Sequence, residues 1–253
     1  MKRIVLFGTG NLATHLFEAY KDSLNFKIVQ VFNHDLKSLK KFKSEIATTT
    51  NLSEIIQADI YLLALKDDVL EDFSKKITDS GALVVHTSGA VRMNVLQNFG
   101  RSGVFYPLQT FSKSKEVEFT TIPICVEANS ASDKEVIFKM ASEISTKVFE
   151  ISSEQRKSLH VAAVFVSNFV NLLYTEGEII CKQNNVPFKI LHPLIQETAG
   201  KILNISPREA QTGPAKRKDQ QVITAHLGML SEEQKEIYSL LTKSIQNLHG
   251  EEL

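Results

Sequence analysis

The segment that most limits the fold of this chain is a glycine-rich turn close to its N-terminus. Gly8–Ala13, with the sequence GTGNLA, follows a short apolar run at Ile4–Phe7 and opens an amphipathic stretch. In a strand–turn–helix unit, Gly8 permits the tight turn, Gly10 lets the backbone approach a pyrophosphate, and Ala13 lets the helix pack closely on the strand. The helix N-terminus adds free N–H groups and partial positive charge. The turn therefore predicts a dinucleotide site, with a cofactor-free turn as the open alternative.

The first 150 residues alternate short β-branched runs with helix-like stretches. Seven runs are expected to be strands: Ile4–Phe7, Lys27–Phe32, Ile60–Leu65, Leu83–His86, Gly103–Tyr106, Pro123–Glu127 and Lys147–Ile151. Amphipathic pieces lie between several of them, at Asn11–Lys21, Leu36–Phe42, Val69–Ile77 and Asp133–Ile144. Short apolar strands separated by helices are typical of βαβ units in a parallel sheet. The pattern predicts an α/β, doubly wound Rossmann-type domain with a crevice at the carboxyl ends of its strands.

The pattern changes after residue 151. Ser152 is a candidate helix cap, and the stretch from Glu154 to about Asn184 contains no proline. Further helices are expected at Lys189–Asn204, Arg217–Met229 and Ser231–Leu248. The sequence thus predicts two domains, residues 1–152 for dinucleotide binding and an all-α domain at 153–253 for substrate binding and dimerisation. The long helix is apolar all round near residues 161–166, so we expect it to be buried.

Charge and cysteine content exclude several classes of protein. Lys and Arg number 29 and Asp and Glu also number 29, and the balance holds on both sides of residue 150. Neither half has the basic surface of a nucleic-acid or membrane-surface binder. Cys125 and Cys181 stand far apart and form no metal-binding motif. Uninterrupted apolar runs are too short to cross a bilayer. These features favour a cytoplasmic protein with a small-molecule substrate, no nucleic-acid or membrane partner and no metal.

The end of the second predicted strand bears on which dinucleotide is bound. A site for NAD usually has an acidic residue about twenty residues beyond the glycines, on the ribose 2′-hydroxyl. Asn33 occupies that place, and a neutral amide does not repel a 2′-phosphate. His34 or Lys37 can help to neutralise the phosphate, whereas Asp35 keeps NAD possible. We therefore expect NADP as the cofactor, with NAD as the alternative.

Several motifs together resemble a known family. They are Gly8–Ala13, Ala64–Asp68, His86–Gly89, Tyr106–Phe111, the pair His160–Ala163 and Ser167–Asn168, and Thr212–Asp219. The chain resembles the 6-phosphogluconate dehydrogenase-like reductases and is similar to a bacterial family with a Rossmann-like domain and a C-terminal DUF2520 domain. The resemblance implies an NADP oxidoreductase, or a coenzyme-F420-dependent one, with an all-α C-terminal domain like that of 6-phosphogluconate dehydrogenase.

The resemblance also has departures that bear on the reaction. Relatives carry His-Pro-Leu where this chain has Tyr106-Pro107-Leu108, and Arg-Gly-Asp where it has Arg217-Lys218-Asp219. The helix lysine that catalyses the reaction in hydroxyacid dehydrogenases has no counterpart here, and His160 occupies the comparable stretch. The resemblance therefore implies fold and cofactor more firmly than it implies a reaction.

Polar residues in these motifs are the candidate site. Ser88 and Gly89 follow a buried-looking strand and can hold a substrate carbonyl or carboxylate, or can be a strand-ending turn. At about 100° per residue, His160, Ser167 and Asn171 share a helix face, with Asn168 at its border. His160 can donate a proton to a carbonyl or imine, or it can be an ordinary core histidine. Arg217 can clamp a carboxylate or phosphate, and could reach a partner's cleft in a dimer.

The residues predicted to act follow from these arguments and from the resemblance. The catalytic candidates are His160, Ser88 and Asn168. The cofactor candidates are Gly8, Thr9, Gly10, Asn11, Leu12, Ala13, Asn33, His34, Leu65 and Lys66. The substrate candidates are Ser88, Gly89, Gln109, Ser167, Asn171 and Arg217.

These residues predict hydride transfer between NADP and an unidentified small substrate in a cleft between the two domains. A homodimer through the helical domain is also expected. Two alternatives stay open: a dinucleotide-responsive binding protein without turnover, and an F420-dependent NADP oxidoreductase.

Overall fold

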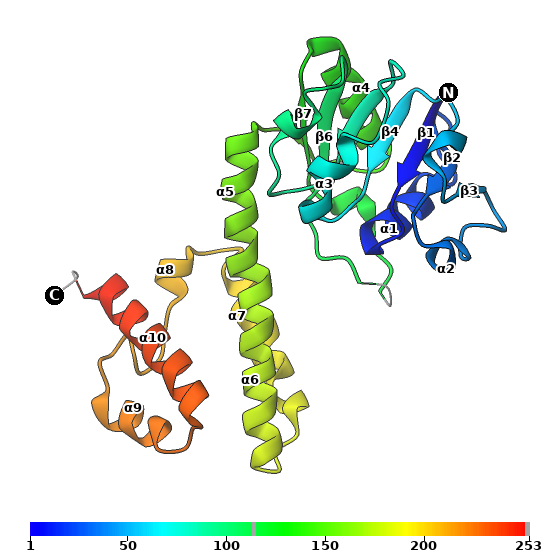
Figure 1. The fold of residues 1–253 in the computed structure, drawn as a ribbon. Coiled ribbons are helices and arrows are strands. Elements are labelled where there is room, and N and C mark those ends of the chain that lie inside the picture. The colour runs from blue at the N-terminus through cyan, green and yellow to red at the C-terminus, as the bar shows by residue number, and fades with distance from the viewer. Residues whose placement is uncertain (113–114, 251–253) are drawn as a thin grey trace. The chain divides into compact units, whose positions relative to one another are not determined.

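The chain forms two compact units. The computed structural model describes residues 1–112 and 115–250, and its contacts divide the chain into residues 1–167 and residues from 168 onwards (Figure 1). The first helix after the sheet, α5 (Ser153–Ala163), begins at the predicted place, where Ser152 and Gln155 form a reciprocal capping box. This helix belongs to the first unit by its contacts. The functional division at residue 152 remains a prediction.

The first unit is built on one eight-stranded sheet. Its strands are β1 (Lys2–Phe7), β2 (Phe26–Phe32), β3 (Ala47–Thr49), β4 (Ile60–Leu63), β5 (Leu83–His86), β6 (Ser102–Pro107), β7 (Ile124–Ala128) and β8 (Val148–Glu150). The order across the sheet is β3-β2-β1-β4-β5-β6-β7-β8. Strand order reverses between β1 and β4, the switch point at which doubly wound sheets bind ligands. The predicted Rossmann-type α/β fold is confirmed.

The sheet is parallel except at one pairing. Strand β7 runs antiparallel to β6, while β8 is again parallel to β7. A parallel pair needs a crossover of about a dozen or more residues, usually through a helix. The segment between β6 and β7 contains only the short 3₁₀ turn η3 (Phe119–Thr121) among its described residues. The predicted parallel sheet is confirmed for every pairing but this one, where the described residues of the segment contain no crossover helix.

Helices cover both faces of the sheet. Along β1, Ile4 and Leu6 face a core that also contains Leu16 of α1 (Asn11–Ala19) and Ile137 of α4 (Ala131–Ser142). The alternate residues of β1 face a second core, built with α3 (Asp67–Ser74) and the 3₁₀ turn η2 (Met93–Leu96). The short helix α2 (Leu36–Leu39) joins β2 to β3. Because both faces are covered, residues 4–7 of β1 and all of β4 are buried on both sides of the sheet and are apolar.

The second unit contains only helices among its described residues. After a π-helical segment, Val164–Phe169, come α6 (Val170–Gln183), the 3₁₀ turn η5 (Phe188–Leu191), α7 (His192–Lys201), α8 (Pro207–Ala210), α9 (Gln220–Leu227) and α10 (Glu232–His249). The Gln234 amide of α10 donates to Glu176 of α6 at 3.0 Å. Tyr238 Oη of α10 lies 2.8 Å from His226 Nδ1 of α9. Polar contacts thus link helices within this unit.

The helical unit leaves much of its apolar surface uncovered. Only two apolar side chains of its described part are buried, Ala215 and Ile223. The run Ser153–Gln183 is long and apolar enough to cross a membrane by length and composition, and none of its most apolar 18-residue window is buried. Our expectation that this helix is buried was wrong for the single chain. The apolar pattern identifies side chains that avoid water, but no element of the described chain covers them.

Candidate functional site

The glycine turn joins β1 to α1 as its spacing predicts. Gly8 has a positive φ of 115°, and a Cβ at this position would lie 2.2 Å from the carbonyl oxygen of Ala64. Only glycine fits there without displacing the backbone of the neighbouring strand. Gly10 caps α1 without a side-chain hydrogen bond, and a Cβ there would meet nothing within 4 Å. The first N–H groups of a nine-residue helix therefore face open space, as a phosphate site requires.

A cavity of about 940 Å³ opens beside this turn. Such a volume lies in the range of small-molecule and cofactor sites. It is lined by the end of β2, by the turns after β1, β2, β3 and β4, and by α3. The residues we predicted for the cofactor that line it are Gly8, Thr9, Gly10, Asn33, His34, Leu65 and Lys66. Asn11, Leu12 and Ala13 are absent from the lining. Ala13 is fully buried against the sheet, which is the packing role expected for it.

Polar side chains at the end of β2 are largely engaged with each other. Asn33 donates to Thr9 Oγ1 at 2.9 Å and accepts from the Asp35 N–H at 2.8 Å. The Asp35 carboxylate accepts from the N–H groups of Lys37 and Ser38, at 3.0 and 3.2 Å, and so caps α2. The Asp35 carboxylate is therefore oriented by the start of α2 and not by the cavity, whose lining does not include Asp35. His34 is exposed and lines the cavity, as do Lys66 and Lys76.

The side chain of Asn11 has a different partner from the one predicted. It donates to the carbonyl oxygen of Phe111 at 2.8 Å, and His15 Nε2 lies 2.9 Å from the carbonyl oxygen of Ser112. These bonds tie α1 to the segment that follows β6. The backbone N–H of Asn11 at the start of α1 and the second proton of its side-chain amide are left for a phosphate.

The turn after β5 is buried and internally bonded. His86 is fully buried, and its Nδ1 accepts from the Ser88 N–H at 3.2 Å. Burial, together with the nearby positive charge of Arg156, lowers the pKa of His86 to about 3. Ser88 Oγ accepts from the N–H groups of Ala90 and Val91, at 3.1 and 2.9 Å. Ser88 therefore shapes the turn, and its hydroxyl proton is what it can still offer a substrate.

Two side chains meet above this turn. Tyr106 Oη, at the end of β6, lies 3.1 Å from His160 Nδ1 on α5. A Cβ on Gly89 would fall 2.6 Å from Tyr106 Cζ and 2.7 Å from His160 Nδ1. Burial raises the pKa of Tyr106 to about 12. Sequence reasoning placed His160 and Gly89 in the candidate site but missed Tyr106, which it recorded only as a departure from relatives.

A buried ion pair holds α5 against the sheet. Arg156 is 1% exposed and bonds to Glu127 of β7, to the Val91 carbonyl oxygen at 2.7 Å and to Ser153 Oγ at 3.2 Å. Ser153 Oγ also donates to Glu127, at 2.8 Å. Residues four apart lie on one face of a helix, one turn on from each other. The network therefore fixes the turn of α5 that precedes His160, and sequence reasoning did not find it.

The remaining predicted residues lie apart from this cluster or in the second unit. Gln109 is exposed, and its side chain accepts from the Thr110 N–H at 2.8 Å. Ser167 lies in the π-helical segment, whose hydrogen bonds span five residues, so the constant α-helical spacing used for the predicted polar face does not hold there. Asn168, Asn171 and Arg217 are exposed residues of the helical unit. Their roles remain predictions.

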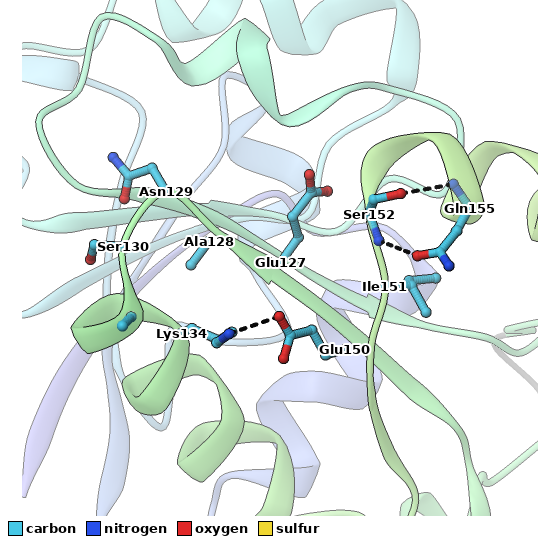
Figure 2. Close-up of a pocket in the computed structure, with 10 residues that line it drawn as sticks. Glu127, Ala128, Asn129, Ser130, Lys134, Glu150, Ile151, Ser152 and Gln155 are labelled. Atoms are coloured by element: carbon cyan, nitrogen blue, oxygen red, sulfur yellow. Dashed lines mark hydrogen bonds and ion pairs between the residues drawn. The ribbon is translucent and has the colours of Figure 1, made fainter.

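A second hollow, of about 600 Å³, lies at the opposite end of the sheet (Figure 2). The charged and capping groups around it are paired among themselves. Lys134 Nζ contacts Glu150 at 2.7 Å, and Ser152 and Gln155 form the capping box of α5. It also lies away from the switch point between β1 and β4. We therefore assign the functional site to the cavity beside the glycine turn.

Comparison with known proteins places the chain among others of the same architecture. Residues 122–245 match the family model described as "Domain of unknown function (DUF2520)". A crystal structure from Bacteroides fragilis, described as a "putative NADP oxidoreductase", is 42% identical, covers 97% of this chain and 98% of its own, and gives a TM-score of 0.88. A Thermotoga maritima protein is 22% identical over 98% of this chain and 99% of its own, with a TM-score of 0.79.

A more distant structure shares the fold. A reductive aminase from Aspergillus terreus, in complex with NADPH and ethyl levulinate, is 11% identical over 98% of this chain and 94% of its own, with a TM-score of 0.74. A search of curated proteins returned no match.

Proposed function

Because this chain belongs to the DUF2520 family and has the fold of the 6-phosphogluconate dehydrogenase-like Rossmann oxidoreductases, we propose that it is an NADP-dependent oxidoreductase acting on a small substrate. The observation that carries the proposal is the cavity of about 940 Å³ beside the Gly8 turn, at the switch point of the sheet. The relative at 42% identity carries the same activity class in its description. The fold and the cavity beside the glycine turn support this reaction class; the substrate is unidentified.

The residues around the cavity fit a dinucleotide. The N–H groups at the start of α1 would hold the pyrophosphate, which Gly8 and Gly10 allow to approach the backbone. Asn33 and His34, at the end of β2, would lie beside the adenosine ribose, and Leu65 and Lys66 line the cavity after β4. A nicotinamide dinucleotide supplies or accepts a hydride when it is bound there.

The polar groups at the end of β2 favour NADP over NAD. The nearest acid is Asp35, and its carboxylate accepts hydrogen bonds from the N–H groups that begin α2. The cavity lining includes the cationic side chains of Lys66 and Lys76, which can balance a 2′-phosphate, although Asp68 and Asp72 of α3 also line it. We expect NADPH to bind more tightly than NADH.

The turn after β5 would orient the substrate, and His160 would exchange a proton with it. In the proposed reaction, Ser88 and the N–H groups near Gly89 orient a carbonyl or imine, and His160 shuttles the proton that accompanies hydride transfer. His160 is half-buried, and one nitrogen of its ring can donate a proton while the other accepts one, which suits a proton shuttle.

Fluorescence titration of the purified protein with NADPH and NADH tests the proposal. We expect saturable binding of NADPH and a weaker response to NADH. If neither cofactor binds at millimolar concentration, the proposal is refuted. If cofactor binds but no aldehyde, 2-oxo acid, imine or alcohol reacts, the dinucleotide-responsive binding protein is favoured instead. A His160→Ala variant that binds NADPH normally and loses a measured turnover excludes that alternative.

The apolar surface of the helical unit leads us to propose a homodimer. Leu172, Leu194 and Leu203 are 46%, 61% and 83% exposed, and the described chain supplies no further segment to cover them. Single chains rarely leave large apolar patches in water. Light scattering should give twice the chain mass of 28.3 kDa, and Leu194→Glu should lower it. A monomer that binds phosphatidylcholine vesicles would refute the dimer and favour a membrane contact.

A further inference from the structure

Tyr106 and His160 form a hydrogen-bonded pair. The proposed function gives a role to His160 and none to Tyr106. The 3.1 Å contact joins the phenol oxygen to His160 Nδ1, and the two rings meet edge to face with centroids 6.1 Å apart. Gly89 packs so closely on both that a side chain there would collide with them. The pair is therefore held by strand β6, helix α5 and the turn after β5.

The pair lies at the edge of the sheet toward which the cofactor would extend. The cavity takes its lining from the ends of β2 and β3 on one side of the glycine turn, and from the turn after β4 on the other. A dinucleotide with its adenosine beside β2 and its pyrophosphate at β1 continues across β4 and β5. Neighbouring strands are about 4.8 Å apart, so β6 lies about 14 Å from β1. The nicotinamide end of a bound dinucleotide would therefore extend toward the strand that carries Tyr106.

The surroundings of Tyr106 suit a group that gives a proton. Burial favours the neutral phenol, so Tyr106 keeps its proton throughout the neutral range. The phenol proton can point at only one acceptor. If His160 Nδ1 carries a proton and donates it to Tyr106 Oη, the phenol proton is free for a substrate. His160 is half-buried, so solvent can exchange protons with the ring.

We propose that Tyr106 is the catalytic residue that gives the proton to the substrate carbonyl oxygen or imine nitrogen, with His160 as the positioning residue that holds and reloads it. The inference rests on the proposed function, and it moves the final donor from His160 to Tyr106. The reacting carbon accepts a hydride, and the π electrons of its double bond move to the oxygen or nitrogen. That atom takes the phenol proton. Tyr106 Oη then takes the proton from His160 Nδ1, while Nε2 takes one from solvent. Proton exchange of the half-buried ring with water then restores the tautomer that carries its proton on Nδ1.

Tyr106→Phe tests the donor, because it removes the hydroxyl and keeps the ring. Tyr238→Phe is the matched control, since Tyr238 also pairs with a histidine Nδ1, that of His226 at 2.8 Å. The substrates are NADPH with 1-pyrroline, pyruvate or benzaldehyde. We expect Tyr106→Phe to lower kcat at least about 100-fold, with an unchanged Kd for NADPH and an unchanged Tm. Tyr238→Phe should retain wild-type kcat.

The results separate the two hypotheses. A wild-type protein that binds no NADPH defeats the proposed function and this inference with it. Wild-type turnover with an equally active Tyr106→Phe variant defeats the inference alone. If no probe reacts, ¹⁵N NMR of labelled histidine decides. A proton on His160 Nδ1, with a resonance that shifts in Tyr106→Phe, supports the inference. A bare Nδ1 that accepts the phenol proton overturns it, because that proton is then committed to His160.

Discussion

His86, beneath the turn that carries Ser88 and Gly89, should make folding sensitive to mild acid. Because Nδ1 accepts from the Ser88 N–H, the ring must carry its proton on Nε2, and burial keeps it neutral. Its pKa falls from 6.5 to about 3 on folding. A base with a lowered folded-state pKa contributes stability above its unfolded pKa, and that stability is lost as pH falls. The shift makes the free energy of unfolding about 2 kcal/mol lower at pH 5 than at pH 7.

His86→Asn isolates this effect, because the amide oxygen can still accept from the Ser88 N–H but the side chain does not titrate. The variant loses volume at both pH values, so its overall stability falls, and the comparison concerns only the change with pH. Urea unfolding followed by circular dichroism should show that the wild-type protein loses about 2 kcal/mol more than the variant between pH 7 and pH 5. Equal losses in the two proteins would refute the reasoning, as would an NMR titration of His86 with a midpoint near 6.

Substitutions in three regions test separate parts of the site. Gly8→Ala should destabilise the fold and abolish NADPH binding. Gly10→Ala should leave the Tm unchanged and only weaken NADPH binding. If both variants lowered the Tm equally, the difference in space around the two glycines would be contradicted. Glu127→Gln should cost about 3 kcal/mol in urea unfolding because it leaves the Arg156 charge buried without its partner, and adding Arg156→Met should restore part of the loss. Asp35→Asn should leave the ratio of NADPH to NADH affinity unchanged; a large rise in that ratio would show that the carboxylate contacts the ribose.

Much of the fold follows from local patterns. The predicted strands correspond to β1, β2 and β4 to β8, and the predicted long helix begins at Ser153 as its cap indicates. The three-residue strand β3 (Ala47–Thr49) escaped prediction because so short a run has no visible alternation. The burial of the long helix was predicted wrongly. Hydrophobic pattern identifies a face that must leave water, but it does not say which molecule covers that face.

The candidate site, like the fold, contains some features that local sequence patterns predict and others that they do not. Gly8 was predicted from spacing, because the motif reflects local backbone geometry. The capping role of Asp35 could also have been found, since Asp before a short helix is a preferred cap. The contact of Tyr106 with His160 spans 54 residues and exists only because the fold brings the end of β6 and α5 together. No local signal in the sequence marks it.

The tight packing at Gly89 has a consequence for how this site can change in evolution. A side chain at position 89 would displace both Tyr106 and His160. A shorter ring at position 106, such as an imidazole, would no longer reach His160 and would leave space that a larger residue at position 89 could fill. Positions 89, 106 and 160 should therefore vary together among homologous chains, and an exchange at one of them alone should be selected against.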